Sequence, residues 1–520
     1  MLLAFILTIL FLSVFAYLCS QGEKYPDAPT LRVSTKPGTM GTLEDKMMYV
    51  TDIMKLLDVG WERYSKKGIN YILLAPTRKF YIVAHKYLDE VRRAPETHVS
   101  NLASNNETMQ TRYTLHPKLM WDQYHFDIPI RKSLTQSLGP KLRDIADEGK
   151  LALNQFLGSS KDWECRPIYR LGFEVTTRTA NRLLFGIDLA RDAEFQNLSI
   201  EYSEIMFGGA EIIRSYPELL KPIVMWWKTD IYRAQALAKK ILCPIIKARI
   251  EQGDRYIAEG RQAEWEKIKA DDAIQWVLDV SPRKERVPDL LVYRMLHINI
   301  SAVHTSSVTF LEIILNLSVT PEYHEELRDE IVQIFRQERG WTKQALTYLV
   351  KMDSYCTETM RLNVLSSFKL GRKVIKDWQL SDGIKIPKGT FLFCNHSTVV
   401  QDADYFENPH HFDPWRMFRL RQRDGEANKH QFVMTSDTNL AFGHGKHACP
   451  GRFFAANEIK TLLVLFLMRY DFEATNLKGG IAEVKKGRWF NSTRLPIDHA
   501  IIKFRERTSR IPEDLRVHFV

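Results

Sequence analysis

The sequence predicts a mainly α-helical protein with a minor β subdomain and an N-terminal membrane anchor helix. Three observations support this fold class. Apolar side chains recur at helical spacing along most of the 520 residues. Short apolar runs separated by turn residues, near 71–84, predict a few strands. Residues 2–19 form an uninterrupted apolar stretch without a charge. The chain is long enough to bury a large core and contains no internal repeat.

The first apolar stretch reads LLAFILTILFLSVFAYLC. At about 1.5 Å per residue, a helix of this length just crosses a hydrocarbon core of about 30 Å. Lys24, Arg32 and Lys36 follow the stretch and no basic residue precedes it, so the positive-inside rule places the rest of the chain in the cytosol. A cleaved signal peptide is the alternative, but a basic start and a small-residue cleavage site are not clear.

We therefore divide the chain into three parts. Residues 1–20 are expected to form a single transmembrane anchor, and residues 21–41, which contain three prolines, a linker. Residues 42–520 are expected to form one globular catalytic domain.

Composition excludes several classes of function. The six cysteines form neither a CxxC pair nor a cluster with histidine, which argues against a zinc site or a disulfide framework. The formal charge of +10 is modest for this length, and the basic residues lack the aromatic motifs of RNA-binding proteins. We expect no nucleic-acid partner, and a membrane surface or an acidic protein fits the charge better.

The elements follow in chain order. Strands are predicted at 71–74 and 80–83, joined by a turn at Pro76, and further strands near 370–374, 390–394 and 500–504. The polar stretch 101–118 is predicted to be an irregular loop facing the substrate. Helices are predicted at 290–317, 342–362 and 452–469, the last with a strongly apolar face. Residues 490–496 are predicted to form a loop that reaches the substrate.

Residues 212–229 read IIRSYPELLKPIVMWWKT. Two prolines interrupt the stretch, and Met225, Trp226 and Trp227 form an apolar aromatic patch. Because tryptophan is enriched at membrane interfaces, we interpret this stretch as a lip over the substrate entrance that dips into the bilayer. A plain core helix is the alternative.

The stretch FGHGKHACPGR, residues 442–452, organises the rest of the chain. Cys449 lies just before a predicted helix, whose N-terminal N–H groups favour a thiolate. Gly445 and Gly451 allow a close backbone approach or a positive φ beside the sulfur, and Phe442 is suited to lie against a flat cofactor. The alternative is a buried structural thiol. The complete spacing Phe-x-x-Gly-x-x-x-Cys-x-Gly resembles the haem-thiolate loop of the cytochrome P-450 monooxygenases.

This resemblance implies the cytochrome P-450 fold and a haem b whose iron takes the Cys449 thiolate as its axial ligand. Arg131, Arg372 and His447 are then candidates to bind the haem propionates. The family usually has a tryptophan four residues before the arginine at 131, where this chain has Asp127. A solvated arginine on an exposed helix face is therefore the alternative for Arg131.

The long helix at 290–317 carries Ser301-Ala302-Val303-His304-Thr305 in its middle. In the family, small residues here leave room for oxygen and a threonine relays protons, a role that the resemblance assigns to Thr305. His304 replaces the usual acid or amide, and histidine can also carry a proton near neutral pH. The alternative for Thr305 is a packed side chain that bonds back to the preceding turn.

The Glu-x-x-Arg pair of the family is matched by Glu358 and Arg361, which share a helix face at i and i+3. The third member, from the segment Phe-Asp-Pro-Trp-Arg, is Arg416. The resemblance implies that the three form a structural ion group that locks the fold around the cysteine loop.

The whole pattern resembles a microsomal cytochrome P-450. The residue sequence of the cysteine loop is similar to that of fungal secondary-metabolism members, many of which oxidise terpenoids. The implied function is monooxygenation of an apolar di- or triterpenoid with O2 and electrons from an NADPH-cytochrome P-450 reductase, with cytochrome b5 as a possible second donor. The implied location is the endoplasmic reticulum membrane, with the catalytic domain in the cytosol. Lys132, Lys446 and Arg452 are candidates for a basic face that docks the reductase.

Other readings stay open at this point. The substrate could be a polyketide, an indole-diterpene or an alkaloid. The chain could also be a haem-thiolate isomerase or dehydratase that needs no external electrons, or a non-enzymatic haem or membrane scaffold protein.

Overall fold

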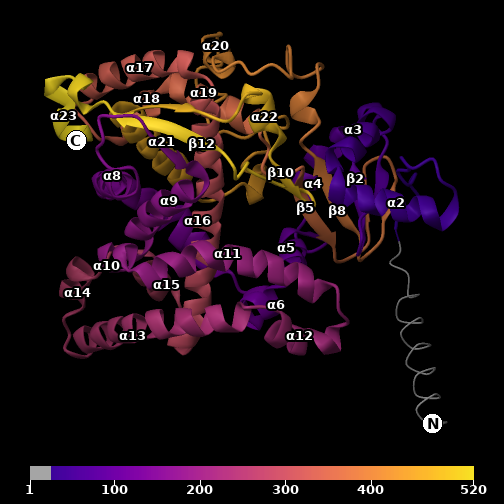
Figure 1. The fold of residues 1–520 in the computed structure, drawn as a ribbon. Coiled ribbons are helices and arrows are strands. Elements are labelled where there is room, and N and C mark those ends of the chain that lie inside the picture. Colours follow the sequence, from indigo (N-terminus) through magenta and orange to yellow (C-terminus); the bar gives the residue numbers. More distant parts are fainter. Residues whose placement is uncertain (1–24) are drawn as a thin grey trace.

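A computed structural model describes residues 25–520 of the protein (Figure 1). The predicted anchor, residues 1–20, and the start of the predicted linker lie outside the described residues. Within the described part, α16 (Pro288–Ser318) is long and apolar enough to cross a membrane, but 72% of its most apolar window is buried inside the protein. It is therefore a core helix.

The helical part is built around α16, which runs through its middle in Figure 1. Apolar side chains cover nearly every face of this helix, as expected for a fully buried one. It packs against α9 (Ile168–Phe185), α13 (Ile231–Ala258) and α21 (Arg452–Arg469). The predicted helix at 452–469 is thus present with the predicted bounds. The predicted helix at 290–317 begins two residues earlier, because Pro288 is favoured in the first turn.

The main sheet lies at the side of the molecule that also carries α2 (Gly38–Thr51) and α3 (Ile53–Arg63) (Figure 1). Its strand order is β1-β2-β8-β5-β3. The pair β2–β8 is parallel and the other pairs are antiparallel. The bounds are β1 Tyr71–Leu74, β2 Lys79–Val83, β3 Val99–Ser100, β5 Phe368–Val374 and β8 Phe391–Asn395.

Strand β5 contains an irregularity that matters for the site. Its register against β8 shifts between Lys369 and Arg372, and Leu370 has a φ of 53°. Residues three apart on a regular strand point to opposite faces. Because the bulge inserts extra residues, Lys369 and Arg372 both line the same cavity.

Two stretches differ from their prediction. The polar stretch 101–118 is helical, with α5 (Asn101–Met109), α6 (Thr111–Thr114) and the short helix η3 (Pro117–Met120). Ser100 caps α5 by accepting a hydrogen bond from the N–H of Ala103 at 2.9 Å, which compensates for the weak helix propensity of the polar residues. The predicted helix at 342–362 is two helices, α18 (Lys343–Tyr348) and α19 (Val350–Leu362), separated at Leu349.

The stretch 212–229 does not form a core helix. After α11 (Ala193–Arg214) the chain forms α12 (Lys221–Lys228), of which only Val224 is buried. Trp226 is 69% exposed and Trp227 is 72% exposed. The alternative of a buried helix is therefore wrong, and the aromatic patch lies on the surface.

The remaining elements complete the helical layers and three small sheets. They are α4 Leu88–Arg93, α7 Tyr124–Ile128, η4 Pro129–Leu134, α8 Thr135–Leu157, β4 Glu164–Pro167, α10 Ile187–Arg191, η5 Glu218–Leu220, α14 Gln262–Ile268, α15 Ala273–Val280, α17 His324–Gln337, β6 Trp378–Gln379, β7 Lys385–Ile386, α20 Arg416–Arg421, η9 Gly445–His447, β9 Tyr470–Ala474, α22 Gly480–Lys486, β10 Arg488–Phe490, β11 Thr493–Leu495, β12 Ile501–Glu506 and α23 Arg516–Phe519.

Candidate active site

A cavity of about 950 Å³ lies between the middle of α16 and the loop that precedes α21. Strand β5 and helix α5 supply further walls. The cysteine loop and the helix with Thr305 are about 140 residues apart in sequence, yet both line this one space. Among the described residues, Cys449 is the only cysteine that lines it.

The loop holds Cys449 through its backbone. The N–H of Cys449 donates to the carbonyl oxygen of Phe442 at 2.7 Å, and its carbonyl oxygen accepts from the Arg452 guanidinium at 2.8 Å. Burial raises the pKa of the Cys449 thiol. The N–H groups of Gly451 and Arg452 and the positive charges of Arg452 and Lys369 act in the opposite direction. The sulfur is therefore placed where a bound cation would complete the stabilisation of a thiolate.

The two glycines of the motif differ in their conformation. Gly445 has a φ of 73°, and a Cβ there would lie 2.5 Å from the Arg92 Cγ, so both reasons for glycine apply. Gly451 has a φ of −87°, and no described protein atom lies within 4 Å of the position of its Cβ. Of the two expected reasons for glycine, positive φ does not apply to Gly451, which lines the cavity with open space at its Cβ position, as a close backbone approach would require. Phe442 also lines the cavity and packs edge-on against Phe432.

Basic side chains gather on one wall. Arg372 is 2% exposed; its Nη1 donates to the carbonyl oxygen of Gly371 at 2.9 Å, and its buried Nη2 has no hydrogen-bond partner among the described residues. Burial lowers the pKa of the Arg372 guanidinium. The Arg131 guanidinium lies on the cavity wall and donates to the carbonyl oxygen of Lys446 at 3.3 Å. A buried donor without a partner costs about 1–3 kcal/mol, so an anionic group of a ligand fits this wall.

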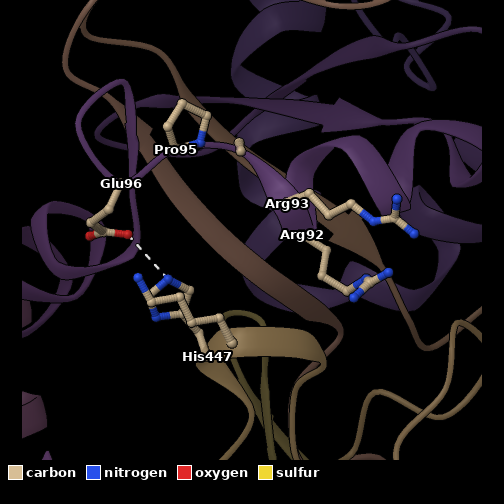
Figure 2. Close-up of a pocket in the computed structure, with 7 residues that line it drawn as sticks. Arg92, Arg93, Pro95, Glu96 and His447 are labelled. Atoms are coloured by element: carbon tan, nitrogen blue, oxygen red, sulfur yellow. Dashed lines mark ion pairs between the residues drawn. The ribbon is translucent and has the colours of Figure 1, made fainter.

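His447 connects the cysteine loop to α5 (Figure 2). Its Nε2 lies 3.2 Å from Oε2 of Glu96, and in Figure 2 the two side chains point toward one another while Arg92 and Arg93 extend away from them. The same carboxylate accepts hydrogen bonds from the N–H groups of Asn101 and Leu102, at 3.2 and 3.0 Å. Burial alone would raise the pKa of Glu96, but the bonds from His447, from the Ser100 hydroxyl at 2.6 Å and from these two N–H groups hold it at about 2. One carboxylate therefore joins the helix over the cavity to the cysteine loop.

On the opposite wall, Thr305 is exposed to the cavity. Its hydroxyl donates to the carbonyl oxygen of Ser301 at 3.0 Å, so the bond back to the preceding turn is present. The same oxygen is still able to accept a hydrogen bond from a donor in the cavity.

His304 has a different environment. Its ring lies 5.6 Å from the Phe173 ring and 6.4 Å from the Phe207 ring, and its buried Nδ1 has no partner among the described residues. Burial lowers the pKa of His304 to about 4. The imidazole is therefore neutral near pH 7, and the expected part of His304 in proton transfer stays a prediction for the neutral ring.

The structure also shows lining residues that sequence reasoning missed. Lys369 donates to the carbonyl oxygen of Ala441 at 3.2 Å, and burial lowers the pKa of its ammonium to about 8. At the other end, His297 lines the cavity and its Nδ1 lies 3.0 Å from Nε2 of the buried His125. His297 is eight residues before Thr305, two helical turns, so spacing alone could have found it. The β5 bulge that turns Lys369 inward has no comparable signal.

The three residues of the expected ion group lie together and buried. The Glu358 carboxylate accepts from the Arg361 guanidinium at 2.8 Å twice and from the Arg416 Nε at 3.2 Å. The Arg361 Nη1 also donates to the carbonyl oxygens of Val400 and Pro409. The group therefore ties α19 and α20 to the irregular chain that leads toward the cysteine loop.

Residues 490–496 do not form the predicted substrate loop. They belong to the hairpin of β10 and β11, and none of them is among the described residues that line the cavity. Arg494 anchors the hairpin because its guanidinium donates to the buried Glu312 carboxylate on α16 at 2.5 Å. In contrast, Asn101, Leu102 and Met109 of α5 do line the cavity, so the stretch 101–118 faces it as a helix.

Comparisons with known proteins agree with this arrangement. The family model described as Cytochrome P450 matches residues 74–489. Cytochrome P450 monooxygenase 103 of Postia placenta is 32% identical over 87% of this chain and 88% of its own length. Cytochrome P450 monooxygenase olcJ of Penicillium canescens is 34% identical over 75% of this chain and 73% of its own. The solved structure of retinoic acid bound cyanobacterial CYP120A1 superposes with a TM-score of 0.64 at 17% identity, covering 93% of this chain and all of that one.

Proposed function

Because this chain belongs to the cytochrome P450 family, and is a monooxygenase with a cysteine-ligated haem b, we propose that it oxidises an apolar terpenoid in fungal secondary metabolism. The observation that carries the proposal is the single cavity in which Cys449 and Thr305 face each other across apolar walls. The fungal source of the relatives supports the assignment to fungal metabolism.

We assign the residues that hold the haem from the basic wall and the cysteine loop. Cys449 would hold the haem iron through its thiolate, and Arg372, Arg131 and His447 would bind the propionates, with Lys369 as an additional candidate; all five line the cavity. The unpartnered Nη2 of Arg372 supports this assignment, because a propionate oxygen would satisfy it. When bound, the thiolate-ligated haem supplies the activation of O2 that places one oxygen atom in the substrate.

The protein's own side chains then position the reactants. The Thr305 hydroxyl on α16 is exposed to the cavity, and it is able to donate a proton there once its O–H rotates away from the Ser301 carbonyl oxygen. His304, as a neutral ring against Phe173 and Phe207, shapes the apolar wall. Phe126, Ile300 and Leu134 add apolar surface suited to a hydrocarbon skeleton.

We also propose the endoplasmic reticulum membrane as the location, with the catalytic domain in the cytosol. Two exposed apolar surfaces support membrane contact. One is α12 with the preceding Leu219, which is 91% exposed; the other is the stripe Met40, Leu43 and Met47 on α2. Such surfaces are unusual on a protein that contacts only water.

P450 monooxygenases need a redox partner, and for this chain we propose an NADPH-cytochrome P-450 reductase, with cytochrome b5 as a possible second donor. Lys446 and Lys132 are exposed next to the cysteine loop and are available to an acidic partner. Arg452 is less available, because its guanidinium is bonded to the Cys449 carbonyl oxygen and stacks on Phe453.

The experiment that tests the function is an optical titration of the ferric protein with a panel of terpenoid hydrocarbons. The reduced carbonyl adduct is recorded first, because a thiolate-type spectrum shows that Cys449 ligation is intact. We expect at least one skeleton to shift the spin state and to be oxidised when reductase and NADPH are added. An intact thiolate spectrum without any shift contradicts the terpenoid substrate and directs the search to polyketides, indole-diterpenes or alkaloids.

A further inference from the structure

A second cavity of about 880 Å³ adjoins the one that contains Cys449. Leu102 of α5 and Trp121, just after η3, line both cavities, so the two spaces meet at these side chains. The outer walls come from the turn between β1 and β2, from the end of β5 and from the segment between α11 and α12. In Figure 1, α5 lies between the sheet and α11.

The charge of this second cavity is unbalanced. Six basic and two acidic side chains line it. Both acidic side chains are already engaged, because Glu107 forms an ion pair with Lys373 and Glu218 forms one with Lys221 at 2.7 Å. Arg214 forms an ion pair with Glu211, which does not line the cavity. The positive charges of Arg78, Arg112 and Lys388 have no ion pair among the described residues. A concave surface with one sign of charge concentrates ligands of the opposite sign.

Arg78 is the basic residue whose position is most informative. It lies in the β1–β2 turn and is partly buried, with its guanidinium carbon 5.0 Å from the centre of the Phe391 ring and 5.5 Å from that of Phe80. No described carboxylate lies within ion-pair distance of Arg78. Burial and the nearby charge of Arg214 both lower the pKa of its guanidinium. The two rings hold the planar group in place while leaving its five donors available for a bidentate anion.

We propose that Arg78 binds a carboxylate on the substrate, and that the apolar body of the same molecule passes Leu102 and Trp121 into the cavity that contains Cys449. This inference rests on the proposed function and narrows the substrate class to apolar terpenoids that carry an acid group. The carboxylate fixes which end of the molecule stays in the outer cavity. It therefore selects the carbon atoms that reach the site of oxidation.

The test compares an acid with its uncharged derivative. Full-length protein in detergent is titrated with abietic acid and with methyl abietate, following the ferric spin state and, in parallel, equilibrium dialysis, which detects binding that leaves the spin state unchanged. We expect the wild type to bind the acid about tenfold more tightly than the ester, and Arg78→Gln to remove that preference while leaving ester affinity unchanged. A tenfold change corresponds to about 1.4 kcal/mol.

Two further variants separate the charge from the fold. Arg78→Lys keeps a cation over the same rings and is expected to retain most of the preference for the acid. Arg233→Gln is the matched control, because Arg233 lies on α13 with its side chain 88% exposed; it is expected to behave as wild type. The reduced carbonyl spectrum of each variant confirms an intact haem site before it is compared.

Several outcomes would overturn the proposal. They are equal affinity for acid and ester, an acid preference that survives Arg78→Gln, and binding of neither compound by dialysis. Vesicles of anionic phospholipid that compete in an Arg78-dependent way, without a preference for the acid, would assign the site to a lipid headgroup instead. The proposed function is judged separately, because oxidation of the ester with reductase and NADPH would retain it while the acid-binding inference fails.

Discussion

At the scale of single residues, Thr305 is the sharpest test of the site. Its hydroxyl faces the cavity and bonds to the Ser301 carbonyl oxygen. We expect Thr305→Ala to lower the rate of substrate oxidation by about a hundredfold, the lower end of the range for loss of a proton-transfer group, with an unchanged carbonyl spectrum. Thr347→Ala is the control, because Thr347 makes the same bond to the preceding turn on the exposed helix α18. Wild-type turnover in Thr305→Ala would remove the residue from the proton path.

His304 leads to a prediction about pH. Its folded-state pKa of about 4 is below the ordinary 6.5, so the unfolded chain binds the proton more readily between these values. The stability contributed by the buried neutral ring is therefore present above about pH 6.5 and is lost as the pH falls toward 4. We expect His304→Asn to flatten this part of the stability–pH curve, measured by denaturant unfolding. Its pH profile of turnover between 6 and 8 should match the wild type.

The sequence was sufficient to predict which residues belong to the site, but not what surrounds each of them. The motif spacing was sufficient to select Cys449, Thr305 and the three members of the ion group from the sequence. It could not show that His304 packs between two phenylalanine rings, because Phe173 and Phe207 belong to helices about 100 residues earlier. Nor could it place Arg78 beside Phe391, since that contact depends on pairing β2 with a strand 310 residues later.

At the scale of elements, the ion group of Glu358, Arg361 and Arg416 joins α19 to α20. Glu358 is fully buried, and removing it leaves two arginines without their carboxylate. We expect Glu358→Ala to lower the free energy of unfolding by about 3–5 kcal/mol, a large part of a typical 5–15 kcal/mol. Denaturant unfolding and haem incorporation both report this loss. Glu264→Ala is the control; its ion pair with Arg261 on α14 is exposed, and an unchanged midpoint is expected.

Glu458 connects α21 to α9. It lies on α21, accepts a hydrogen bond from the Thr179 hydroxyl of α9 at 2.9 Å, and burial raises its pKa to about 8. Between about pH 4.5 and 8 the unfolded chain ionises this group while the folded one keeps it neutral, so stability falls as the pH rises. We expect Glu458→Gln to lose less stability than wild type between pH 5 and 8. The free energy of unfolding, measured with denaturant at both pH values, checks this. If the free energy of unfolding changes equally with pH in wild type and Glu458→Gln, Glu458 is not a buried neutral carboxyl.

Element bounds followed from sequence where apolar periodicity was strong, as in α21, and failed where capping decided the outcome. The residues of α5 are mostly polar, and their helix depends on Ser100 and on Glu96, whose carboxylate is shared with His447. Helix propensity judged from neighbouring residues does not include the contact of Glu96 with His447, which lies 351 residues later in the chain. The hairpin of β10 and β11 is displaced from the cavity for a similar reason, the bond between Arg494 and Glu312.

At the scale of the whole molecule, the exposed apolar surfaces of α12 and α2 define a side suited to a bilayer. We expect the double variant Trp226→Phe with Trp227→Phe to lose a large part of the fluorescence quenching that brominated lipids produce in the full-length protein in nanodiscs. Trp163→Phe is the control, because Trp163 is 45% exposed but lies beside Lys503 and Arg505 on another sheet. If brominated lipids quench the fluorescence of the double variant and of Trp163→Phe equally, α12 does not contact the membrane.

The bulge in β5 has a consequence for how this family member tolerates changes in length. Lys369 and Arg372 face the same cavity only because the strand carries extra residues at Leu370. Inserting one more residue between Lys369 and Arg372 would turn one of the two cations toward the opposite face of the sheet, whereas deleting Leu370 would leave them two residues apart and on one face. The segment 375–390 beyond the strand leads through a short hairpin and lacks this constraint. Insertions are therefore expected to be tolerated after Val374 and excluded between Lys369 and Arg372, so that the spacing of these two residues, and not only their type, preserves the cationic wall.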